Sequence, residues 1–194
     1  DSASGKMNIA DDIVTHRQLM GIPLQPCDLD FTTCLYRYEK PASPHLSVKL
    51  ANAVLDFKII TKSTQQLQQS YDAVLLEGAG GLLVPITEQL LTLDYIAEQD
   101  YPVVLVTSGR LGSINHTLLS LEAIKARGLT LHSAIYNHIH DSAAQTDDEI
   151  TNSTIDYLKN YLARHYPNSY WLQMAQQINS TIGNNNLALP PDFI

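Results

Sequence analysis

A glutamate followed by glycines could bind a metal ion together with the phosphates of a ligand. Glu77 follows the apolar run 72–76 and precedes the glycine-rich residues 78–81. A carboxylate at the tip of a buried strand is well placed to hold Mg²⁺, and glycines let backbone N–H groups approach an anion. A glycine turn required only for backbone geometry, with Glu77 as a solvated end residue, is the alternative.

A second candidate for chemistry is the segment 107–116 (TSGRLGSINH), which follows the apolar run 102–107. It ends where a helix is expected to start, with Ser113 or a neighbour as the cap. Free N–H groups and the dipole at a helix start attract anions, and Arg110 adds positive charge. The segment therefore predicts a carboxylate site, unless it is an ordinary strand-to-helix turn.

Two weaker candidates involve single polar positions. Asn137 ends a third apolar run, where its amide could read a nucleotide base. Asp11 and Asp12 open a helical pattern, so Asp12 is either a second Mg²⁺ ligand or an acid favoured by the helix dipole.

The histidines and cysteines show no metal-ligand spacing. His138 and His140 are expected to be loop or surface residues, and Cys27 and Cys34 to be ordinary reduced thiols.

The elements that would position these residues alternate along the chain. Strands are expected at 72–77, 102–107, 131–137 and 170–174, because short continuous apolar runs are typical of buried parallel strands. Helices are expected at 11–20, 44–54, 56–69, 115–127 and 148–165. The pattern predicts a doubly wound, mostly parallel α/β sheet in a single domain, 1–194, with ligands beyond the carboxyl ends of its strands. Glu77 and Ser113 should therefore converge on one pocket.

The charge balance excludes some partners. With 12 Lys+Arg against 20 Asp+Glu, the net charge is -8, which disfavours binding to nucleic acid phosphates. No apolar run reaches the ~18 residues of a membrane span, and no leader pattern opens the chain. We expect a cytoplasmic protein that binds neither membranes nor nucleic acids.

Five segments together resemble the dethiobiotin synthetase family of biotin biosynthesis. Residues 71–86 (YDAVLLEGAGGLLVPI) are similar to its most recognisable segment, and residues 109–120 (GRLGSINHTLLS) to its substrate-side turn and helix. Ser43-Pro44-His45, Ser4-Gly5 and the Asn- and Leu-rich residues 184–189 resemble further family elements. Arg110 stands where the family commonly has lysine.

The resemblance implies a fold, a reaction and ligands. The fold would be that of P-loop NTPases, usually as a homodimer with the substrate site at the interface. The enzyme would be a cyclo-ligase that uses ATP and Mg²⁺ to convert 7,8-diaminononanoate and CO₂ into dethiobiotin, through a carbamate and a carbamic-phosphoric anhydride.

The resemblance also implies residue roles. Asp12 and Glu77 would ligate Mg²⁺ and border the nucleotide, and Ser4 and Glu77 would be catalytic. Further nucleotide contacts would come from Gly78, Gly80 and Asn137. Substrate contacts would come from Ser4, Gly81, Arg110, Leu111, Gly112, Ser113 and Asn115.

The family's Gly-Lys-Thr phosphate loop does not occur in these 194 residues. Gly5-Lys6-Met7 does not match the loop, which has the form G-x-x-x-x-G-K-[ST] between a strand and a helix. We expect an N-terminally incomplete member of the family. A non-catalytic dimer that binds substrate without turnover, and another P-loop amidoligase or ATPase, remain as alternatives.

Overall fold

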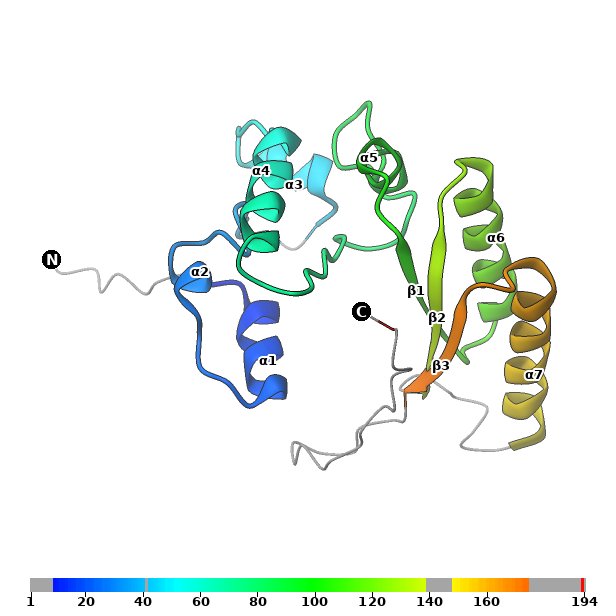
Figure 1. Cartoon of the computed structure of the whole chain (residues 1–194). Coiled ribbons are helices and arrows are strands. Elements are labelled where there is room, and N and C mark those ends of the chain that lie inside the picture. Colours follow the sequence, from blue (N-terminus) through cyan, green and yellow to red (C-terminus); the bar gives the residue numbers. More distant parts are fainter. Residues whose placement is uncertain (1–8, 41, 139–147, 175–192, 194) are drawn as a thin grey trace, which may run out of the picture. The chain divides into compact units, whose positions relative to one another are not determined.

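The computed structural model describes residues 9–40, 42–138, 148–174 and 193 (Figure 1). The chain divides into two compact units, residues 1–90 with 191–194 and residues 91–190. Among the described helices, none combines the length and the apolar character needed to cross a lipid bilayer.

The described part of the first unit is helical. Its helices are α1 (Asp11–Met20), α2 (Pro26–Leu29), α3 (Pro44–Leu50) and α4 (Phe57–Gln68). Helix α1 ends at Gly21, which has a φ of 67°, a left-handed conformation that glycine adopts without strain. The Asp56 side chain caps α4 by accepting a hydrogen bond from the backbone N–H of Lys58.

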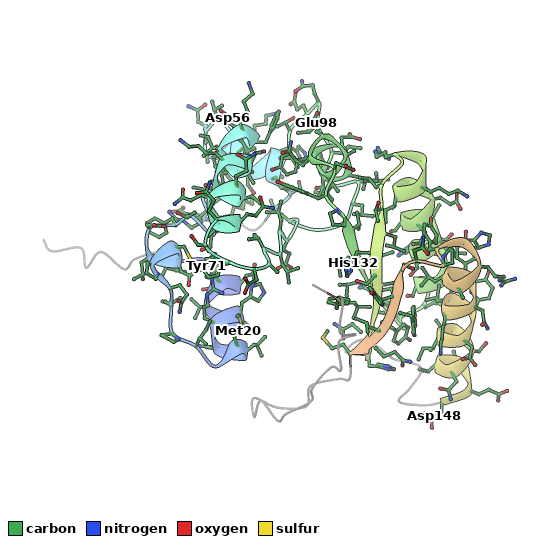
Figure 2. The ribbon with its side chains drawn as sticks, viewed as in Figure 1. Met20, Asp56, Tyr71, Glu98, His132 and Asp148 are labelled. Atoms are coloured by element: carbon green, nitrogen blue, oxygen red, sulfur yellow. The ribbon has the colours of Figure 1, made fainter. Side chains whose placement is uncertain are left out.

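Polar contacts hold these short helices together. Arg17 on α1 donates two hydrogen bonds to Asp28 on α2, at 2.8 and 2.9 Å. The Tyr36 hydroxyl accepts from the N–H of Asp56 and donates to its carbonyl. Tyr71, labelled in Figure 2, lies with its hydroxyl 3.3 Å from the Cys27 thiol. Side chains thus link elements that are too short to bury a large apolar face.

The prediction of a buried strand at 72–77 is wrong for the structure described. No residue of this run lies in the sheet, and the side chains of Leu75 and Leu76 are 88% and 46% exposed. An apolar run becomes a strand only where neighbouring strands satisfy its backbone N–H and C=O groups. Among the described residues, none pairs with this segment in that way.

The second unit contains a three-stranded parallel sheet. Strands β1 (Val103–Ser108), β2 (Leu131–Asn137) and β3 (Tyr170–Met174) lie in the order β1-β2-β3. Helix α5 (Thr92–Gln99) precedes β1, and α6 (Ser113–Ala126) and α7 (Asp148–His165) are the crossovers between successive strands. Parallel strands require such crossover connections.

The core of this unit lies between the sheet and its two crossover helices. Tyr136 of β2 and Leu158 of α7 are fully buried, and Ile114 of α6 and Trp171 of β3 pack against them. Figure 2 labels His132 on β2, whose ring lies 5.5 Å from that of Tyr170 on β3. On β1 burial alternates, so that Leu105 is buried and Val106 is 59% exposed.

Most of the predicted elements are confirmed. The residue ranges of α1, β2, α7 and β3 match the predictions, and β1, α4 and α6 differ by one or two residues at their ends. Helix α3 ends four residues earlier than predicted, and α2 and α5 were not predicted. The α/β class with a mostly parallel sheet is confirmed.

Candidate functional site

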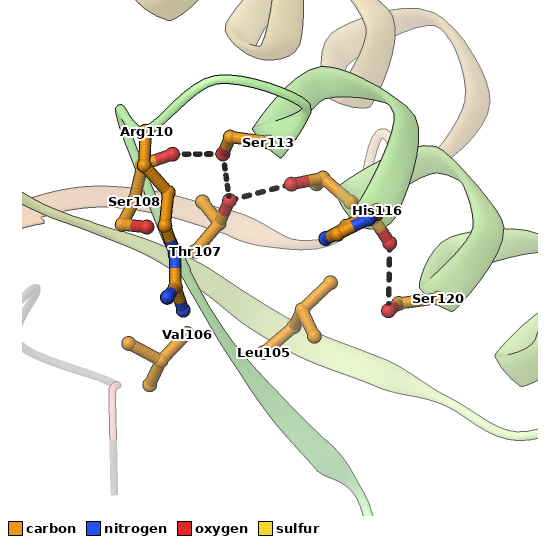
Figure 3. Close-up of a pocket in the computed structure, with 9 residues that line it drawn as sticks. Leu105, Val106, Thr107, Ser108, Arg110, Ser113, His116 and Ser120 are labelled. Atoms are coloured by element: carbon orange, nitrogen blue, oxygen red, sulfur yellow. Dashed lines mark hydrogen bonds between the residues drawn. The ribbon is translucent and has the colours of Figure 1, made fainter. Parts of the chain in front are cut away.

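A pocket of about 110 Å³ opens where β1 ends and α6 begins. Sites for whole small molecules usually measure roughly 300–1,000 Å³, so this pocket suits one small group of a ligand. The polar residues that line it are Thr107, Ser108, Arg110, Ser113, His116, Thr117 and Ser120. Figure 3 shows Arg110 from the loop and His116 from α6 at this pocket.

The turn between β1 and α6 depends on Gly112. This residue is the N-cap of α6 and has a φ of 87°, a conformation that side-chain-bearing residues rarely adopt. The sequence predicted Ser113 or a neighbour as the cap, and the neighbour Gly112 takes that position. A Cβ atom added to Gly112 would lie 4.0 Å from Nε2 of His116, so glycine also leaves the pocket side of the turn open.

Two backbone donors at the start of α6 face no acceptor in the part of the chain that the structure describes. The N–H of Ser113 bonds to the carbonyl of Arg110 at 2.9 Å, and that of His116 to the carbonyl of Gly112 at 3.0 Å. The intervening N–H groups of Ile114 and Asn115 have no such partner. Unpaired N–H groups at the positive end of a helix dipole favour an anion.

Arg110 brings a full positive charge to the same place. No ion pair or side-chain hydrogen bond involves its guanidinium among the described residues. A guanidinium can bind a carboxylate through two parallel hydrogen bonds. Arg110 thus lines the pocket, and the two unpaired backbone donors lie beside it in the first turn of α6, at residues that are not among the pocket's lining. A cation and free N–H groups are the kinds of donor that bind a carboxylate.

Buried hydroxyl groups form the floor of this pocket. The Thr107 hydroxyl lies 3.3 Å from the Ser113 hydroxyl and also bonds to the Thr117 hydroxyl. The Ser113 hydroxyl donates to the carbonyl of Ser108. These contacts join the last residues of β1 to the first two turns of α6.

A second group of candidate residues lies in the first unit. Glu77 has an exposed side chain, and its Oε2 atom lies 3.7 Å from Nε2 of His16 on α1. Asp12 precedes His16 by one helical turn, so both side chains lie on the same face of α1. The structure thus brings the Asp12 face of α1 toward the Glu77 segment.

Comparisons with known proteins decide the family. Residues 26–181 match the family described as AAA domain. The ATP-dependent dethiobiotin synthetase BioD 2 of Haemophilus influenzae is 55% identical over 134 residues, which are 69% of this chain and 70% of the relative. The proteins of the same name in Pasteurella multocida and Haemophilus ducreyi are both 45% identical, over 86% and 90% of this chain and 76% and 81% of the relatives. This chain belongs to the dethiobiotin synthetase family.

The donor set of this family member fits Mg²⁺. No cluster of three or more His, Cys, Asp or Glu side chains that could enclose a metal occurs among the described residues. Mg²⁺ bound with nucleotides usually takes one or two carboxylates and completes its shell with phosphate oxygens and water. Glu77 and Asp12 are carboxylates of the kind that such a smaller set requires.

The end of β2 carries the residue expected near the base. Asn137 is the last residue of β2 and pairs in register with Met174 of β3. The next side chain, His138, approaches Gln173 of β3 with Nε2 and Oε1 3.2 Å apart. Amide and imidazole groups therefore gather at the carboxyl ends of two parallel strands, where such sheets bind ligands.

One predicted site residue, Ser4, lies outside the described residues. His140, which was expected to be a loop or surface residue, and residues 184–189, which carried part of the resemblance, also lie outside them. The glycines at 78, 80 and 81 are described, and Gly80 has a φ of 103°. Both cysteines are free, as predicted.

Some pocket residues were not named individually from the sequence, although Thr107 and His116 lie in the predicted segment 107–116. His116, Thr107 and Thr117 all line the pocket. Thr117 and His116 follow Ser113 by four and three residues, so the helical repeat could have placed them beside it. Thr107, at the end of a strand, had no signal beyond its position.

Proposed function

We propose that this protein is a cyclo-ligase that closes the ureido ring of dethiobiotin from 7,8-diaminononanoate and CO₂ at the expense of ATP. The observation that carries the proposal is the start of α6, where Arg110 lines a small pocket and two unpaired N–H groups lie in the adjoining first turn of the helix. The substrate has one carboxylate, which matches a pocket of this size and charge. The names of the relatives, with identities of 45–55%, support the same reaction.

The chemistry has three steps. One amine of the substrate attacks CO₂ and loses a proton, which gives a carbamate. A carbamate oxygen then attacks the γ-phosphorus of ATP, and ADP leaves. The second amine attacks the carbamoyl carbon and loses a proton, the bond from that carbon to the phosphate oxygen breaks with its electron pair leaving on phosphate, and the five-membered ring is closed. Phosphoryl transfer of this kind depends chiefly on positioning and on neutralising charge.

Each candidate residue has a part in this proposal. Arg110 and the N–H groups of Ile114 and Asn115 hold the substrate carboxylate, so the two amines are fixed at the far end of the chain. Asp12 and Glu77 hold Mg²⁺, which when bound neutralises phosphate charge. The remaining proposed contacts are Gly78, Gly80 and Asn137 for the nucleotide, and Ser4, Gly81, Leu111, Gly112 and Ser113 for the substrate.

We also propose a homodimer in which a second copy covers the exposed face of α6. Leu111 is 100% exposed and Leu119 is 60% exposed. Leu111 lies in the turn before α6, and Asn115 and Leu119 lie four residues apart on one side of the helix. Apolar side chains grouped beside a ligand pocket are typical of a surface that a partner covers. We further expect the protein to work in the cytoplasm.

A direct assay tests the function. Purified full-length protein is incubated with 7,8-diaminononanoate, bicarbonate and MgATP, and dethiobiotin is measured by mass spectrometry. Product that requires every component supports the proposal. Calorimetric binding of the diamine without any product would instead support a non-catalytic member of the family.

A further inference from the structure

The hydroxyl groups beneath the start of α6 form one continuous chain of hydrogen bonds. Thr107 contacts both Ser113 and Thr117, and Ser113 contacts the carbonyl of Ser108. The residues Thr107, Ser113 and Thr117 are only 8%, 7% and 3% exposed. Losing one of these contacts therefore leaves a buried polar group without its protein partner.

The chemistry of hydroxyl groups fixes the direction of this chain. Each hydroxyl has one hydrogen to donate. Ser113 donates its hydrogen to the carbonyl of Ser108, so in its contact with Thr107 it must accept. Thr107 therefore donates to Ser113, and it accepts from Thr117. Each hydroxyl therefore donates to the next group in the order Thr117, Thr107, Ser113 and the carbonyl of Ser108.

This direction limits what Ser113 can do for a ligand. Its only hydrogen is engaged, so its side chain offers a bound anion no donor. The donors left for a carboxylate are Arg110 and the backbone N–H groups of Ile114 and Asn115. The positions of those N–H groups depend on how the first turn of α6 is held against β1.

We propose that Thr107 is a positioning residue for the substrate carboxylate. This positioning role rests on the proposed function, because the carboxylate is that of 7,8-diaminononanoate. Within this series of hydrogen-bonded hydroxyl groups, Thr107 is the member that contacts two turns of α6. It contacts Ser113 in the first turn and Thr117 in the second. Removing its hydroxyl leaves Ser113 without its donor and Thr117 without its acceptor. The first turn of α6 is then held less firmly against β1, and the backbone N–H groups of Ile114 and Asn115 are no longer fixed in position.

The test compares two substitutions of the same residue in the full-length protein. Thr107→Val keeps the shape and removes the hydroxyl, and Thr107→Ser keeps the hydroxyl. We expect Thr107→Val to raise the KM for 7,8-diaminononanoate about tenfold, as the loss of a buried hydrogen bond predicts. The kcat and the KM for ATP should stay within about twofold, and Thr107→Ser should restore most of the affinity.

A matched control removes a buried hydroxyl elsewhere. Thr64 of α4 is 6% exposed, and its hydroxyl donates a hydrogen bond to the carbonyl of Ile60 within the same helix. Thr64→Val should leave the KM for the diamine unchanged. The inference would be overturned if Thr64→Val raised the KM for the diamine as much as Thr107→Val does. It would also be overturned if Thr107→Val raised the KM for the diamine and the KM for ATP equally.

Two further outcomes separate this inference from the proposed function. If the wild-type protein makes no dethiobiotin, the proposed function fails. If the wild type is active and Ser113→Ala raises the KM for the diamine while Thr107→Val does not, then the Ser113 hydroxyl donates a hydrogen bond to the substrate and the positioning role of Thr107 is wrong.

Discussion

The imidazole Nε2 of His16 lies 3.7 Å from the carboxylate Oε2 of Glu77. This contact ties α1 to the glycine-rich segment that begins at Glu77. Because Asp12 lies one turn before His16 on the same helix face, the two acidic residues proposed for Mg²⁺ belong to neighbouring surfaces of one unit.

Replacing Glu77 tests the proposed metal site. Glu77→Gln keeps the size of the side chain and removes its charge, so we expect kcat to fall about 100-fold and the Mg²⁺ concentration for half-maximal activity to rise. Steady-state rates measured across a Mg²⁺ titration report both effects. Glu88→Gln, at an exposed position of the same unit, is the control. An unchanged Mg²⁺ dependence for Glu77→Gln would remove this residue from the metal site.

Arg110 should determine the affinity for the substrate carboxylate. Arg110→Ala removes a charged hydrogen-bond donor, and we expect the KM for 7,8-diaminononanoate to rise at least about tenfold with little change in the KM for ATP. Arg110→Lys keeps the charge but cannot form the bidentate pair, so its KM for 7,8-diaminononanoate should lie between those of the wild type and Arg110→Ala. Arg164→Ala, on the exposed surface of α7, is the matched control. If Arg110→Ala and Arg164→Ala have the same KM for 7,8-diaminononanoate, the substrate carboxylate does not bind at Arg110.

The exposed face of α6 should control assembly. We expect the double substitution Leu111→Asp and Leu119→Asp to convert a dimer into monomers, because four charges would then face each other across the interface. Light scattering coupled to size exclusion measures the mass directly. Ile150→Asp on α7, where Ile150 is 55% exposed, should leave the mass unchanged. A wild-type protein that is monomeric at assay concentrations would contradict the proposal.

The stability of the first unit should fall in acid through Asp28. Hydrogen bonds from Arg17 hold the pKa of this buried carboxyl below its ordinary value of 3.8, and bonds from Gln25 and Thr33 act in the same direction. A carboxyl whose pKa is lower in the folded protein binds protons more readily when unfolded. Its contribution is therefore complete above the ordinary pKa and is lost as the pH falls below 3.8 through the folded value.

Denaturant unfolding between pH 3 and pH 7 measures this effect. Asp28→Asn should lower the free energy of unfolding at pH 7 by about 3 kcal/mol, because Arg17 loses its charged partner. The variant should also lose much of the acid dependence. Asp72→Asn, at an exposed position, should change neither the free energy of unfolding at pH 7 nor its dependence on acid pH. A wild type and an Asp28→Asn variant with the same pH dependence would assign the acid loss to other groups.

Elements with strong local signals could be predicted from the sequence. The helix from Asp11 to Met20 ends at a left-handed glycine, and the strand from Leu131 to Asn137 lies between turn residues. Residues 72–77 have an equally strong apolar pattern, yet Leu75 is 88% exposed. Strand formation depends on a pairing partner, which the local pattern does not specify.

The candidate site divides in the same way. Arg110 and the helix start near Ser113 were predicted from residue types alone, because charge and helix geometry are local properties. The hydroxyl chain through Thr107 was not predicted, since it joins a strand end to a later helical turn. The short helix from Thr92 to Gln99 was also missed; its two buried apolar residues, Leu93 and Tyr95, lie only two apart and do not show the helical repeat.

The central claim is that this protein joins CO₂ to a diamine with the energy of ATP. The most direct measurement supplies ¹³C-bicarbonate, 7,8-diaminononanoate and MgATP to the purified full-length protein and follows dethiobiotin, ADP and phosphate together. The account predicts that the label appears in the ureido carbon and that the three products form in equal amounts. Hydrolysis of ATP without labelled dethiobiotin, or no reaction at saturating substrates, would contradict it.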